Sequence, residues 1–113
     1  MAELRQLLAK MEEEIAKAQE RYQADQEDSY LSHVRAAEIE ALQALRQRLR
    51  RGESMEELSA WIRQELSRLE ENMEQELNRP SFDWYDEHYQ YKRLEGRRDA
   101  YKIAVGIIEE ALS

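Results

Sequence analysis

Apolar residues recur at alternating spacings of four and three residues, and this pattern limits the possible folds more than any other feature. Within residues 2–26 it produces a heptad seam of Leu4, Leu8, Met11, Ile15, Ala18 and Tyr22. Such spacing places side chains on one face of an α-helix, whereas a half-buried strand requires alternation at every second residue. The narrow seam predicts a helix that packs against one or two partners.

Residues that form turns are scarce. The 113 residues include one proline and three glycines, and 37% of them are charged. A chain of this length forms one domain with a modest hydrophobic core. We therefore predict an all-α fold in which residues 1–113 form a single antiparallel bundle of about four helices, with a long helix at the C-terminus.

Capping signals place the ends of the predicted helices. Asp28 or Ser29 can cap a second helix, Gly52 fits the position just after its end, and Ser54 opens an S-x-x-E capping box. The third helix should stop before Pro80, because a residue that precedes proline avoids the α conformation. The predicted helices cover residues 2–26, 30–51, 55–78 and 83–112.

The last predicted helix has two apolar faces. One consists of Leu94, Tyr101, Val105, Ile108 and Leu112, and the other of Tyr89, Gly96, Ala100, Ile103 and Ile107. One helix with two buried faces needs more neighbours than a three-helix core provides. We therefore predict a homo-oligomer with the second set of residues at the subunit interface. A monomeric four-helix bundle is the alternative.

The net charge of −8 argues against nonspecific binding of nucleic acid through the whole surface. The charge is unevenly distributed. Residues 29–52 hold two acidic and five basic residues, a net charge of +3, whereas the segments on either side are net acidic. Alternation of this kind suits antiparallel neighbouring helices that pair through their charges.

Sequence patterns of common enzymes and metal sites are missing. The chain has two histidines and no cysteine, and it contains no H-E-x-x-H motif, glycine-rich phosphate loop or nucleophile elbow. Asp83, Asp86, Glu87 and His88 could together hold a metal ion, but acids in a first turn also stabilise a helix N-terminus, which is the interpretation preferred here. We predict a non-enzymatic protein without a cofactor or a metal site.

Nothing in the sequence resembles a membrane span or a signal peptide. No run of about 18 apolar residues occurs. The first residues, MAELRQLLAKMEEE, are partly acidic and lack an apolar core. The expected location is the cytoplasm, without a membrane partner.

Aromatic and basic side chains gather in the segment 89–102, which contains five basic residues. Guanidinium groups bind phosphate through a fork of donors, and aromatic rings stack on bases. The predicted ligand-binding residues are Trp84, Tyr91, Arg98 and Lys102 on one flank of the helix, Arg93 and Arg97 on the other, and Tyr101 on the stripe between them. In the alternative interpretation the rings belong to the core and the cations pair with Glu70, Glu71, Glu74 or Glu76.

The last turns, YKRLEGRRDAYKIAVGIIEEAL, resemble the C-terminal helix of small phage and prophage accessory proteins. In those proteins a tyrosine-rich turn precedes a glycine, an Asp-Ala pair and an aliphatic run. The matching residues here are Tyr89, Tyr91, Gly96, Asp99, Ala100, Tyr101, Ile103, Ile107 and Ile108, and the segment that contains the resemblance covers about a fifth of the chain. The resemblance implies immune evasion, either by oligomers that trap cyclic nucleotide signals or by acidic proteins that block nucleic-acid sites.

These observations lead to a functional hypothesis with two alternatives. We predict that the protein sequesters an anionic small ligand, such as a nucleotide immune signal, at a subunit interface. The first alternative is an acidic module that binds or inhibits another protein, by mimicking nucleic acid or by docking a helix. The second is a structural subunit of a larger assembly.

Overall fold

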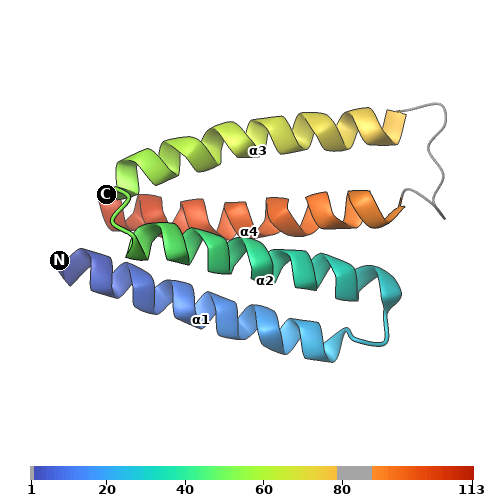
Figure 1. Ribbon diagram of the computed structural model, residues 1–113, viewed down its shortest axis with the longest axis horizontal. Helices are drawn as coiled ribbons and strands as arrows, with labels where there is room; N and C mark the ends of the chain where they lie inside the picture. Colours follow the sequence, from blue (N-terminus) through green and yellow to red (C-terminus); the bar gives the residue numbers. More distant parts are fainter. Residues whose placement is uncertain (1, 79–87) are drawn as a thin grey trace.

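The computed structural model describes residues 2–78 and 88–113, which form four α-helices (Figure 1). They are α1 (Ala2–Ala24), α2 (Ser29–Arg50), α3 (Met55–Asn78) and α4 (His88–Leu112). These ranges contain no strand, so the all-α prediction is confirmed. The bounds agree with the predicted ones to within two residues, except that residues 83–87 of the predicted last helix lie outside the described residues.

Two of the predicted helix starts show the expected capping hydrogen bonds. The Asp28 carboxylate accepts from the backbone N–H groups of Tyr30 at 2.9 Å and Leu31 at 3.0 Å. At the start of α3 the Ser54 hydroxyl oxygen accepts from the Glu57 N–H at 3.1 Å. These bonds satisfy amide groups that have no partner inside the helix.

The end of α2 also follows its sequence signal. Gly52 has a φ of +98°, a value that glycine adopts without a steric cost. Its N–H donates to the Leu49 carbonyl oxygen at 3.1 Å, and the Glu53 N–H donates to the Arg48 carbonyl oxygen at 3.2 Å. This pair of bonds is a Schellman motif, which closes the helix and directs the chain into α3.

We predict that Asp28→Ala lowers the free energy of unfolding by about 1 kcal/mol, because two amide groups at the start of α2 lose their acceptor. Thermal and urea unfolding followed by circular dichroism would measure the change. Glu27→Ala is the control, since Glu27 is exposed and lies one residue earlier. Equal unfolding free energies for the two variants would contradict a stabilising role of the cap.

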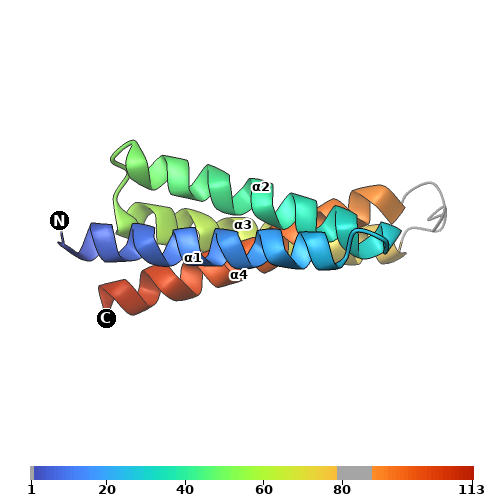
Figure 2. The same cartoon turned by 90° about the horizontal axis from the view of Figure 1, so that it is seen from below.

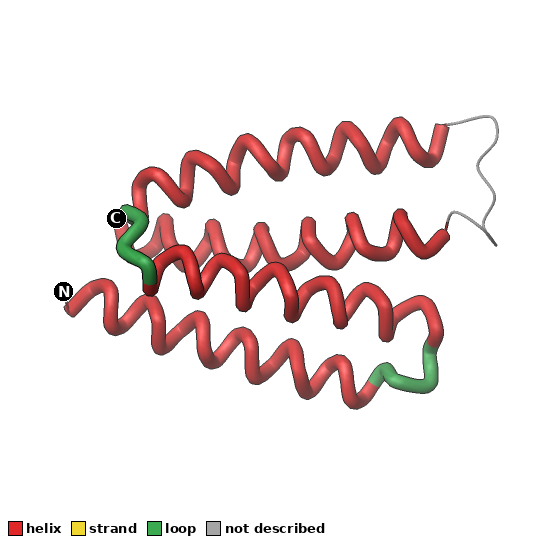
Figure 3. Tube along the Cα trace, in the orientation of Figure 1, coloured by secondary structure: helices red, strands yellow, loops and turns green. Residues whose placement is uncertain are grey.

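The helices run alternately up and down, so that α2 and α4 point in the same direction (Figures 1 and 3). These two parallel helices pack closely against each other. A Cβ atom built at Gly96 would lie 2.2 Å from the Val34 carbonyl oxygen and 2.8 Å from the Ala37 Cβ. The backbones of α2 and α4 therefore lie in close contact at Gly96, in a bundle with overall extents of 49 × 30 × 21 Å.

The other two helices lie on either side of this parallel pair. Figure 2 shows α1 across the junction of α2 and α4, and α1 contacts both of them. α3 packs along α4 and diverges from α2 beyond the connection between them (Figure 1). No helix in the described part of the chain combines the length and apolar character that a membrane span requires.

A single hydrophobic core connects all four helices. In α1 the core includes Leu7, which is 1% exposed and was not part of the predicted seam, whereas Leu4 and Leu8 are only partly buried. The buried face of α1 therefore lies closer to Leu7 than the predicted seam does, because α2 and α4 cover the helix from two sides. On α3, Leu77 is 44% exposed near the C-terminal end of the helix.

Most of both apolar faces of α4 is covered within one chain, although Leu112 at the end of the helix is 38% exposed. Tyr101 and Ile108 of the first face are buried, and so is Ala100 of the second face. Gly96 contacts α2 directly, while Ile103 and Ile107 pack partly buried against the core. The side chain of Tyr89 lies outside the described residues. Gly96 and Ala100, two of the residues predicted at a subunit interface, are therefore buried inside the bundle, whereas Ile103 and Ile107 keep part of their surface exposed.

Candidate functional site

The structure divides the predicted ligand-binding residues between two separate grooves. Arg93, Arg97 and Tyr101 line a groove between α2 and α4, here called the α2–α4 groove. Tyr91, Arg98 and Lys102 line another between α3 and α4, the α3–α4 groove. Trp84 lies outside the described residues. The two flanks of α4 therefore face different spaces and do not form one site.

The α2–α4 groove has a volume of about 360 Å³. Small-molecule sites occupy about 300–1,000 Å³, so this groove can hold one small ligand. It exists because α3 diverges from α2 and leaves the flank of the parallel helix pair uncovered (Figure 1). Its lining residues are Ala37, Glu40, Ala41 and Ala44 from α2, and Arg93, Leu94, Arg97 and Tyr101 from α4.

The two walls of the groove differ in chemistry. The three alanines of α2 follow helical spacing and present a smooth apolar surface. α4 supplies the basic and hydroxyl groups, from Arg93 to Tyr101. Among the described residues that line the groove, Glu40 is the one acid. Glu40 could not be predicted from the sequence as a site residue, because an exposed glutamate on a different helix has no distinguishing signal.

Arg97 is the cation of this groove that lacks an acidic partner among the described residues. Its Nη2 atom donates to the Tyr101 hydroxyl oxygen at 3.4 Å, and its guanidinium lies 5.9 Å from the centre of that ring. By contrast, Arg93 lies 3.5 Å from the Glu40 carboxylate, and both side chains are exposed. The charged residues among the described lining residues, two arginines and one glutamate, have a formal charge of +1, in a protein of net charge −8.

Tyr101 is held rigidly with its hydroxyl at the groove. The side chain is 5% exposed, and its ring meets Trp61 edge-on at 5.7 Å between ring centres. The guanidinium of Arg48 lies 4.0 Å from the centre of the Trp61 ring, and Glu53 holds Arg48 through two hydrogen bonds of 2.6 Å. Since the Tyr101 oxygen accepts from Arg97, its own O–H remains available as a donor.

The α3–α4 groove is less suited to an anion. Lys102 lies 3.9 Å from the Glu70 carboxylate, as the alternative interpretation of the sequence predicts. Arg98 lies 3.4 Å from Asp99 and 3.9 Å from Glu95. Glu70 also lines this groove with a second acid of α3, Glu74. The cations here are matched by carboxylates, so an incoming anion would meet negative charge.

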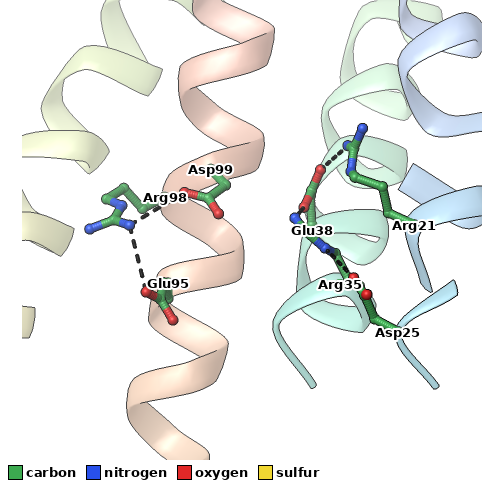
Figure 4. A network of polar contacts seen from close by, with 7 residues as sticks. All are labelled: Arg21, Asp25, Arg35, Glu38, Glu95, Arg98 and Asp99. Carbon is green, nitrogen blue, oxygen red and sulfur yellow. Dashed lines mark hydrogen bonds and ion pairs between the residues drawn. The ribbon is translucent and has the colours of Figure 1, made fainter. Parts of the chain in front are cut away.

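Several other charged side chains of the bundle pair with one another in a buried polar cluster (Figure 4). Glu38 is 1% exposed and accepts hydrogen bonds from Arg21 of α1 and from Arg35, the latter at 3.1 Å. Arg35 also donates to Asp25 at 3.2 Å. These bonds connect the end of α1 to α2, so this cluster stabilises the fold.

Burial also changes the pKa values of two groups close to this cluster, Asp99 of α4 and Tyr30 of α2. Burial raises the pKa of the Asp99 carboxyl, although the adjacent Arg98 guanidinium lowers it. The Tyr30 hydroxyl donates to Glu95 at 2.6 Å, and burial together with this bond raises the pKa of Tyr30 above its usual value. Tyr30 therefore stays protonated at neutral pH and links α2 to α4.

Comparisons with protein-family models, curated proteins and solved structures find no match for this chain.

Proposed function

We propose that the protein binds a small anionic ligand in the α2–α4 groove and retains it without altering it chemically. The observation that carries this proposal is Arg97, which lines the groove and has no carboxylate partner among the described residues. The Tyr101 hydroxyl lies 3.4 Å away as a second donor. Charge-assisted hydrogen bonds of this kind are short and strong, and a guanidinium fork matches phosphate or carboxylate.

This version of the function places the ligand within one chain. It retains Arg93, Arg97 and Tyr101 from the predicted set and does not use Arg98 or Lys102, which face the α3–α4 groove. Sequestration of a nucleotide immune signal, implied by the resemblance to phage accessory proteins, is one form that such binding takes. The protein would act by lowering the concentration of free ligand.

We expect Arg97→Ala to weaken binding by about 10- to 100-fold, because a hydrogen bond to a charged group contributes about 1.5–3 kcal/mol. Isothermal titration with inorganic phosphate, AMP and GMP would measure this. Arg68→Ala is the matched control, since Arg68 lies on α3, is 72% exposed and contacts Glu65 of its own helix. Equal affinities of Arg97→Ala and the unaltered protein would contradict the proposal.

Native mass spectrometry of the protein purified from cells gives an independent test. A retained mass of small-molecule size, present in the unaltered protein and lost in Arg97→Ala, would support binding in the α2–α4 groove. The same spectra give the number of subunits. A retained mass that is unaffected by Arg97→Ala would place the ligand elsewhere.

A further inference from the structure

The Tyr101 hydroxyl lacks an acceptor for its own hydrogen. Tyr101 is 5% exposed, and among the described residues its hydroxyl has one hydrogen-bond partner, the Arg97 guanidinium, which donates to the oxygen at 3.4 Å. Buried polar groups are nearly always hydrogen-bonded, so this O–H group requires an acceptor. Because Tyr101 lines the α2–α4 groove, a ligand in the groove can provide one. A carboxylate has two acceptor oxygens and can bind Arg97 and Tyr101 at once.

The wall that faces these two donors is apolar. The contact of Gly96 with α2 sets the register of the parallel pair, in which each residue of α4 lies level with the residue of α2 about sixty positions earlier. Arg97 is therefore level with about Ala37, and Tyr101 with about Ala41. Methyl groups form no hydrogen bonds and bind by removing apolar surface from water. A ligand that uses both walls has a charged edge toward α4 and an apolar face toward α2.

The charges at the groove favour a ligand with one negative charge. Arg97 has no carboxylate partner among the described residues, so it can neutralise one such charge. Glu40 lies about level with Ala100, next to Tyr101, and its side chain is 67% exposed. A phosphate monoester carries about 1.5–2 negative charges at neutral pH, and Glu40 would repel the excess. A carboxylate carries one charge and avoids most of this repulsion.

We infer that the ligand is a flat aromatic monocarboxylate, whose carboxylate binds Arg97 and Tyr101 and whose ring lies against the alanines of α2. This inference rests on the proposed function. The volume of about 360 Å³ is near the lower limit for small-molecule sites and fits a body of about one or two rings. A flat ring can contact the alanine side chains along its whole face. A phosphodiester also carries one charge, but its two substituents project in different directions and cannot both lie on the alanine wall.

The first experiment is a nuclear magnetic resonance titration of the full chain with benzoate, acetate, benzamide and inorganic phosphate. Acetate lacks the ring of benzoate, and benzamide lacks its charge. We expect benzoate to bind at least about tenfold more tightly than each of the other three, because only benzoate offers both the apolar face and the carboxylate. The amide signals of Ala41 and Ala44 should shift on binding of benzoate, since both residues line the groove.

A second experiment tests the Tyr101 hydroxyl directly. Tyr101→Phe removes the O–H group and keeps the ring, so it should weaken binding of benzoate about tenfold, the loss expected for one hydrogen bond to a charged group. Tyr22→Phe, on α1 outside the groove, is the control and should leave the affinity unchanged. Glu40→Gln should instead strengthen binding of benzoate about twofold, because it removes a negative charge beside the site. Circular dichroism of each variant shows that its fold is unchanged.

The outcomes separate this inference from the proposed function. Equal binding of benzoate and acetate, with both affinities reduced in Arg97→Ala, would overturn the aromatic body and leave the anion site intact. Phosphate binding as tight as benzoate binding, or full affinity in Tyr101→Phe, would overturn the assignment of a carboxylate on these two donors. Benzamide binding as tight as benzoate binding would contradict the inference and the anion site together. Absence of benzoate binding would overturn the inference, and the retained mass in Arg97→Ala would then decide the proposed function.

Discussion

Gly96→Ala is expected to destabilise the bundle by about 1–3 kcal/mol, the usual cost of overpacking a close contact. An added Cβ would lie 2.2 Å from the carbonyl oxygen of Val34, and this backbone atom cannot move without shifting α2. The Ala37 Cβ, at 2.8 Å, blocks the same space. Urea unfolding followed by circular dichroism would measure the loss as a lower midpoint.

Gly106 provides a matched control on the same helix. Apart from the adjacent residues and the backbone of its own helix, no atom lies within 4 Å of a Cβ built there, so Gly106→Ala meets no obstacle. We expect this substitution to stabilise the protein by about 0.5–1 kcal/mol, because alanine has the higher helix propensity. The two substitutions should thus change the unfolding free energy in opposite directions. A stabilising effect at both positions would contradict the close packing of α2 and α4.

Glu38→Ala should lower the free energy of unfolding by about 3 kcal/mol. This is the lower end of the range for breaking a buried ion pair, because Glu38 is buried but its partners Arg21 and Arg35 remain partly exposed to water. The substitution leaves both guanidinium groups without their shared carboxylate. Thermal unfolding by calorimetry would measure the change.

Glu40→Ala is the control for this prediction, since Glu40 lies two residues along the same helix and is 67% exposed. Its removal should change the unfolding free energy by no more than about 0.5 kcal/mol. Similar losses in Glu38→Ala and Glu40→Ala would mean that the cluster around Glu38 does not stabilise the bundle.

The helices and their ends could be predicted because the signals are local. Asp28 and Ser54 cap helices through bonds to residues two or three positions away, and Gly52 ends α2 through its own φ angle. Apolar spacing similarly identifies the buried face of a helix from a few turns. Such signals require no knowledge of which helix lies opposite.

The partner of each face could not be predicted in the same way. Gly96 and Ala100 lie on a face of α4 that was predicted to be buried, and both are buried, but the sequence analysis assigned that face to a second subunit. Periodicity defines the direction of a face and says nothing about the identity of its neighbour. The parallel packing of α2 on α4 depends on the arrangement of all four helices in the bundle.

The candidate site was predictable for one wall only. Arg97 and Tyr101 were identified from their place beside the apolar stripe of α4, whereas Glu40 on the facing helix was not. Arg97 and Arg98 are adjacent in sequence, yet about 100° of helical rotation separates them, enough to place them in different grooves. Grouping them into one site ignored the presence of α3 on the Arg98 flank.

The parallel contact of α2 and α4 affects how the chain folds. α1 and α2 are joined by a short connection and can form a hairpin early, from contacts that are near in sequence. The contact of Val34 with Gly96 instead joins residues about sixty positions apart, so it carries a large loop-closure cost. During synthesis α3 has no α4 to pack against until α4 leaves the ribosome. The bundle therefore closes late, around the helix that is made last.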